Sequence, residues 1–103
     1  MSNKSIVMDS KDNIATAIKE LKKDENIEVE IGEKIKKIVI NQEVPFGHKF
    51  ALTTISQRED VIKYGEIIGA ASKDISVGDY VHVHNLESKR GRGDLKKVKE
   101  GKN

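Results

Sequence analysis

The chain has 103 residues, the length of one small domain. It contains no cysteine, which excludes disulfides and thiolate chemistry and fits a reducing cytoplasm. No apolar run approaches the ~20 residues that a membrane span needs, and no apolar segment follows the N-terminal residues as in a secretory signal. We therefore expect a cytoplasmic protein that does not engage a membrane.

Charge is distributed unevenly along the chain. The net charge is +2, but residues 86–103 carry +4 and residues 1–85 carry −2. A cationic tail attracts anions such as carboxylate substrates, acidic protein surfaces and phosphate. A solvated, unstructured end is the simpler alternative. Because the rest of the chain is nearly neutral and lacks a basic face interleaved with aromatic residues, we do not expect nucleic-acid binding.

One helix is predicted near the N-terminus, after a short strand at residues 5–8. Asp12 can cap a helix that runs through residues 13–22. The apolar residues of this segment recur at the i, i+3, i+4, i+7 spacing of one buried stripe. They are Ile14, Ala17, Ile18 and Leu21.

The other elements are predicted to be strands, with a loop around Pro45. Residues 27–31 alternate between apolar and acidic side chains, and the β-branched segment 35–40 is expected to pair with them. Further strands are expected at residues 49–55, 61–64, 67–71 and 80–85. We find no internal repeat. The sequence thus predicts a mainly β single domain at residues 1–88, with one or two short helices, followed by a basic, flexible tail at residues 89–103.

All three histidines lie in two short apolar segments, apart from the charged runs: His48, His82 and His84. Imidazole is the side chain best suited to proton transfer or metal ligation near neutral pH. In a strand, His82 and His84 would lie on one face about 7 Å apart. Such a pair can chelate a metal or offer two proton carriers. The alternative is that both bond to the backbone or face solvent from a sheet surface.

Three motifs, in this order, resemble one known family. They are Gly47-His48-Lys49-x-Ala51-Leu52, Val61-Ile62-Lys63-Tyr64-Gly65-Glu66-x-Ile68-Gly69 and Ile75-x-x-Gly78-Asp79-x-Val81-His82-Val83-His84-Asn85. With the segment at residues 12–17, they are similar to the small SAF-type (β-clip) domain of the altronate and galactarate dehydratases. Sulfolactate sulfo-lyase small subunits share the pattern. One departure is the turn at residues 57–60, where family members usually carry a glycine.

The resemblance implies a compact SAF/β-clip fold and a lyase. On this basis we expect the small subunit of an altronate-type dehydratase, which removes water from an anionic sugar acid to give a 2-keto-3-deoxy acid. The resemblance also implies a large dehydratase subunit that holds a divalent metal, commonly iron, and we expect this chain to bind none. The alternatives are the small subunit of a sulfolactate sulfo-lyase and a non-catalytic module that binds a sugar acid or a protein.

The resemblance also suggests roles for individual residues. We expect His48, His82 and His84 to be catalytic, in a site that the large subunit completes. The candidates for substrate binding are Lys49, Tyr64, Asn85, Arg90 and Arg92. The lysine suits a substrate carboxylate, and the two arginines could clamp one bidentately. The alternatives are a solvated lysine, a tyrosine that fills the core and a tail without structure.

Overall fold

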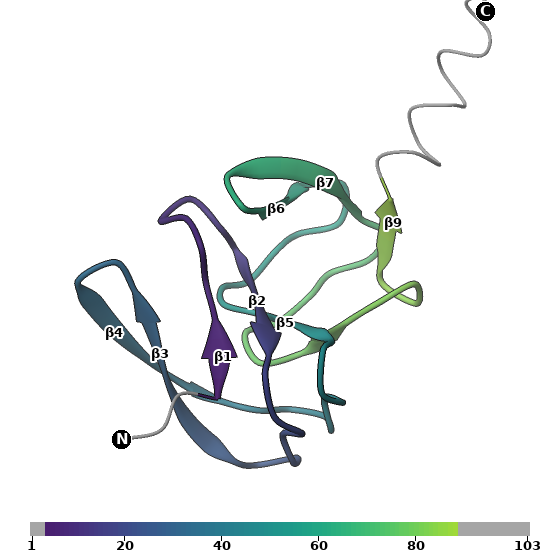
Figure 1. The fold of residues 1–103 in the computed structure, drawn as a ribbon. Helices are drawn as coiled ribbons and strands as arrows, with labels where there is room; N and C mark the ends of the chain where they lie inside the picture. Colours follow the sequence, from purple (N-terminus) through teal and green to yellow (C-terminus); the bar gives the residue numbers. More distant parts are fainter. Residues whose placement is uncertain (1–3, 89–103) are drawn as a thin grey trace, which may run out of the picture.

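The computed structural model describes residues 4–88, which form three antiparallel sheets (Figure 1). The strands are β1 (Ser5–Ile6), β2 (Ile14–Ala17), β3 (Asn26–Ile31), β4 (Lys34–Val39), β5 (Lys49–Ala51), β6 (Asp60–Lys63), β7 (Glu66–Ala71), β8 (Tyr80–Val81) and β9 (Leu86–Ser88). The mainly β prediction is confirmed. Over residues 4–88 the chain forms no helix, so none there is long and apolar enough to cross a membrane.

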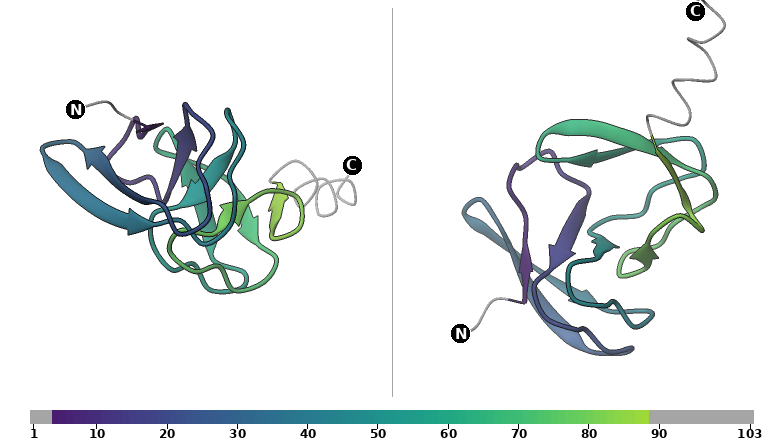
Figure 2. Two further views of the ribbon diagram at one scale, coloured as in Figure 1. Left: turned by 90° about the horizontal axis from the view of Figure 1, so that it is seen from below. Right: turned by 45° about the vertical axis from the view of Figure 1, so that its right-hand side comes forward.

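The four-stranded sheet, in the order β1-β2-β5-β8, is the middle layer of the domain. Because alternate residues of a strand point to opposite faces, this sheet serves two cores. Ala15 and Phe50 pack into one core with the β3–β4 hairpin, and Ile14 and Ala51 pack into the other with β6 and β7. The hairpin and the β6-β7-β9 sheet accordingly lie on opposite sides of the central strands in Figures 1 and 2.

The predicted helix at residues 13–22 is wrong, since residues 14–17 form the central strand β2. Burial on both faces of this strand produces apolar residues at a spacing that resembles a helical stripe. Asp12 does not cap a helix, because its carboxylate accepts a hydrogen bond from the Gly65 N–H at 2.8 Å. The Asn13 side chain likewise accepts from the Ile62 N–H and donates to the Asp60 carbonyl. The polar pair therefore fastens β2 to the β6–β7 hairpin.

Within residues 4–88 one five-residue turn occurs four times, although the sequence shows no obvious repeat. The turns lie at residues 21–25, 44–48, 55–59 and 75–79. The first residue of each is buried and forms a β-bridge with another turn, Leu21 with Val44 and Ile55 with Ile75. The N–H of the fifth residue donates to the carbonyl of the second, as in a type II turn. The fourth residue has positive φ in every case: Asp24, Gly47, Arg58 and Gly78.

The chain after β8 differs from the prediction of one strand over residues 80–85. Strand β8 ends at Val81, and residues 83–85 form a turn. Strand β9, which we did not predict, then pairs with β7. This pairing needs a glycine at residue 69, because a Cβ there would lie 2.2 Å from the Glu87 carbonyl oxygen.

Candidate functional site

Four rings gather beside the start of β5 and the end of β8, and we call them the ring cluster: His48, Tyr80, His82 and His84. The ring centroids of His48 and His82 are 5.1 Å apart, and each lies 5.6 Å from the centroid of Tyr80. The third histidine, His84, also lies 5.6 Å from Tyr80. The structure thus brings all three predicted histidines around a tyrosine that sequence reasoning missed.

The pairing of β5 with β8 explains this proximity. Phe50 pairs with Tyr80 and Lys49 with Val81, so residues 48 and 82 come next in the same register. Alternation places positions 48, 50, 80 and 82 on one face of the sheet. Lys49 and Val81 belong to the opposite face, so the lysine does not join the ring cluster.

Proline at position 45 frees the side chain of His48. In the other three turns the fifth residue is Glu25, Glu59 or Asp79, whose carboxylate accepts a hydrogen bond from the N–H of the turn's second residue. Pro45 has no N–H, so its turn needs no such acceptor. The His48 ring instead lies with its Nδ1 atom 2.9 Å from the Tyr80 hydroxyl oxygen.

This hydrogen bond decides which nitrogen of His48 can do chemistry. With Nδ1 engaged by Tyr80, Nε2 is the nitrogen left for another molecule. For Nε2 to take up or release a proton, Nδ1 must carry its own hydrogen and donate it to the phenol oxygen. Tyr80 thus orients this imidazole, and its hydroxyl oxygen can accept the Nδ1 hydrogen in the tautomer that this chemistry needs.

His84 and Asn85 lie in the turn after β8, so the predicted strand geometry of the His-x-His pair is wrong. Asn85 is buried, and its side chain holds the turn together by accepting from the His82 N–H and donating to the Tyr80 carbonyl. The turn leaves His84 exposed at the surface, and its ring faces Tyr80.

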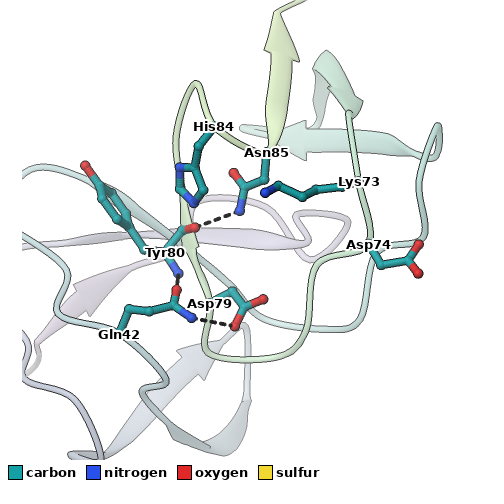
Figure 3. A pocket seen from close by; sticks show the side chains of 7 residues that line it. All are labelled: Gln42, Lys73, Asp74, Asp79, Tyr80, His84 and Asn85. Carbon is teal, nitrogen blue, oxygen red and sulfur yellow. Dashed lines mark hydrogen bonds between the residues drawn. The ribbon is translucent and has the colours of Figure 1, made fainter.

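An open pocket of about 410 Å³ adjoins the ring cluster and shares Tyr80 and His84 with it (Figure 3). The other lining residues are Gln42, Lys73, Asp74, Asp79 and Asn85. Asp79 is occupied by hydrogen bonds from Asn41, Gln42 and Ser76. Figure 3 shows Lys73 extending toward Asn85, whereas the Asp74 carboxylate turns away.

Lys73 and His84 are the groups in this pocket that can receive an anion. Within residues 4–88 neither side chain has a hydrogen-bond or ion-pair partner. An ammonium and an imidazole in a pocket of this size suit a small carboxylate. No sequence motif marks Lys73 or Gln42, whereas Tyr80 was detectable as the residue two positions before His82 on one strand face.

Lys49 and Tyr64 lie away from the ring cluster. Burial and the nearby Lys63 ammonium lower the pKa of Lys49 from its usual value of 10.5. Tyr64 stands at the tip of the β6–β7 hairpin, is 57% exposed and has a φ of 57°. Its ring lies under the Lys63 ammonium at 4.8 Å, so it does not fill the core. Arg90, Arg92 and the predicted tail at 89–103 lie outside the described residues.

The described side chains do not fit a metal ion. Over residues 4–88 no three His, Asp or Glu side chains come together as a possible ligand set. In the ring cluster, Tyr80 already engages Nδ1 of His48. What the cluster offers chemically is proton exchange and hydrogen bonding.

Comparison with known proteins identifies similar sequences. Residues 3–89 match the model of the altronate/galactarate dehydratase SAF domain. Altronate dehydratase of Escherichia coli (strain K12) is 43% identical over 77 residues, which cover 75% of this chain and 15% of that protein. Altronate dehydratase of Bacillus subtilis (strain 168) is 35% identical over 83 residues, which cover 81% of this chain and 16% of that protein.

A (2R)-sulfolactate sulfo-lyase subunit alpha, from Paracoccus pantotrophus, is 41% identical over 54 residues, which cover 52% of this chain and 81% of that protein. The chain therefore spans about a sixth of the length of the altronate dehydratases that it matches. The similar proteins are lyases, and some of them are named as subunits.

Proposed function

Because the chain belongs to the family of altronate/galactarate dehydratase SAF domains, we propose that it works as the small subunit of a sugar-acid dehydratase. In this proposal it supplies the ring cluster to an active site that a large subunit completes. The reaction removes water from the sugar acid and yields a 2-keto-3-deoxy acid. The divalent metal that the family resemblance implies is assigned to the large subunit, as is the base that removes the α-proton.

The hydrogen bond between Tyr80 and His48 is the observation that carries this proposal. In the elimination, the electron pair of the broken C–H bond forms a C=C bond, and the β-hydroxyl leaves as water once it is protonated. We assign that protonation to Nε2 of His48 in its imidazolium form, with the Nδ1 hydrogen held on the Tyr80 oxygen. The enol product then tautomerises to the keto acid.

The adjoining pocket supports an anionic substrate. Lys73 offers a positive charge and His84 a ring nitrogen for hydrogen bonding, beside Tyr80 of the ring cluster. We propose that the substrate carboxylate binds there. This replaces Lys49, whose place on the other sheet face separates it from the ring cluster.

A second candidate is the small subunit of a sulfolactate sulfo-lyase, which expels sulfite in place of water. The match to a subunit alpha of that enzyme favours it, although the altronate dehydratases match a larger share of this chain. The same ring cluster and pocket would serve either anionic substrate.

Turnover by the reconstituted enzyme tests the proposal. The chain is mixed with its purified large subunit, and altronate, galactarate and sulfolactate are supplied in turn. We expect 2-keto-3-deoxy acid only when both proteins are present, and a fall of at least about 100-fold for His48→Ala. Full turnover by the large subunit alone would leave the chain without a catalytic part and favour a non-catalytic binding module.

A further inference from the structure

The turn at residues 44–48 carries an exposed aromatic side chain where its counterparts do not. The third residue of this turn is Phe46, and its side chain is 70% exposed. The equivalent residues of the first and third turns are the exposed polar residues Lys23 and Gln57. In the fourth turn Val77 packs partly against the core. The turn fold therefore does not require a phenylalanine at position 46.

A second exposed apolar side chain lies in the turn that carries His84. Val83 is 80% exposed and stands in the turn between His82 and His84. Within residues 4–88, Val83 and Phe46 are the two most exposed large apolar residues. Val83 directly adjoins two histidines of the ring cluster, and Phe46 lies two residues before the third, His48. Exposed apolar side chains therefore accompany the proposed catalytic groups in both turns.

We propose that Phe46 and Val83 form the contact through which the large dehydratase subunit covers the ring cluster. This inference rests on the proposed function and names the contact surface of its partner. The altronate dehydratases match this chain over only 15–16% of their length, so the remainder of such an enzyme is the surface available to cover the cluster. The partner is expected to present an apolar socket for a phenyl ring and an isopropyl group.

Binding of the purified large subunit tests this contact without relying on turnover. The dissociation constant is measured by isothermal titration calorimetry for the wild type, Phe46→Gln and Val83→Ser. Glutamine already stands at the equivalent position of the third turn, so Phe46→Gln is expected to fold normally. Loss of a buried phenyl contact should weaken binding by roughly 10- to 100-fold, and loss of the valine by roughly 3- to 10-fold.

Matched controls are Met8→Ser and Ile35→Ser, which remove apolar side chains that are 64% and 60% exposed outside the ring cluster. These should change the dissociation constant by less than about twofold. Mass spectrometry after treatment with diethyl pyrocarbonate should show that His82 and His84 are protected in the complex. Unaltered binding by both test variants, or unprotected histidines, would overturn the contact.

The outcomes also separate this inference from the proposed function. If binding depends on Phe46 and Val83 but His48→Ala leaves turnover unchanged, the contact stands and the catalytic role falls. If His48→Ala abolishes turnover while neither apolar substitution changes binding, the catalytic role stands and the contact falls. Self-association of the chain that is lost in Phe46→Gln would show that a second copy occupies this surface, and would also overturn the proposal.

Discussion

The hydroxyl oxygen of Tyr80 lies 2.9 Å from Nδ1 of His48, a contact between side chains 32 residues apart. The pairing of β5 with β8 brings the two residues together, and the absence of an N–H on Pro45 leaves the imidazole free to make the bond. Backbone register and one proline thus produce a pair of groups that can exchange a proton.

Tyr80→Phe is expected to keep the ring packing and lose the hydrogen bond. His48 would lose the hydroxyl that orients its ring and can accept its Nδ1 hydrogen, so the turnover number of the reconstituted enzyme should fall by about 10- to 100-fold with little change in KM. The ¹⁵N chemical shifts of His48 would report the tautomer directly. Unchanged shifts would show that Tyr80 does not position this imidazole.

Two glycines with similar φ values are expected to tolerate alanine very differently. Gly78 has a φ of 87°, and a Cβ there would lie 2.1 Å from the Val39 carbonyl oxygen. Gly47 has a φ of 85° but open space around its Cβ position. Gly47→Ala should therefore cost about 1 kcal/mol of unfolding free energy from backbone strain alone. Gly78→Ala should cost at least ~3 kcal/mol, because the backbone must also shift.

Urea unfolding at pH 7 measures both values. The turn at residues 55–59 shows that the strain is bearable without glycine, since Arg58 has a φ of 78°. Equal losses in the two alanine variants would mean that the close approach at Val39 is not rigid.

Lys49→Met is expected to stabilise the domain at neutral pH. Burial and Lys63 lower the pKa of Lys49 in the folded state, so its charge opposes folding wherever both states are protonated. That opposition is complete below the folded-state pKa. It declines as the pH rises from there toward the ordinary value of 10.5, because only the unfolded state still binds the proton.

Thermal melts at several pH values between 7 and about 10 check this prediction. The advantage of the methionine variant should be largest at pH 7 and shrink toward pH 10. Lys36→Met, at an exposed position of β4, is the matched control and should give no such trend. A constant advantage across this range would mean that the apolar contacts of methionine, not the lost charge, stabilise the variant.

The sequence predicted strands best where one face of the strand is buried and the other is exposed to solvent. Alternation in β3 places Ile27 and Val29 inside, and this strand was found where expected. The sequence-based prediction failed for β2, because Ile14 and Ala15 are buried on opposite faces and the strand therefore shows no alternation of apolar and polar residues. It also failed for β9, a strand of three residues with two of them exposed.

The three histidines could be identified from the sequence, but their arrangement could not. Their meeting around Tyr80 depends on the β5–β8 register and on the turn that Asn85 stabilises after Val81. The four equivalent turns were hidden because they share a backbone shape and not a sequence: positive φ is adopted by Asp24, Gly47, Arg58 and Gly78.

A double variant of the turn at residues 44–48 should separate stability from function. Pro45→Ser combined with His48→Glu gives the turn at 44–48 the serine and glutamate of the turn at 55–59. There the Glu59 carboxylate accepts from the Ser56 N–H at 2.8 Å. The new serine N–H and glutamate should form the same bond, so the unfolding free energy should change by no more than about 1 kcal/mol.

The same double variant should lose activity in the reconstituted enzyme, because no imidazole remains beside Tyr80. Its control is Pro45→Ser alone, which restores the N–H but keeps His48. This control should retain most of the turnover, because the restored N–H at position 45 leaves the imidazole of His48 in place. A double variant that is both stable and fully active would mean that Pro45 and His48, the two residues that distinguish this turn, serve neither folding nor catalysis. That result would remove the reason for assigning His48 to the active site.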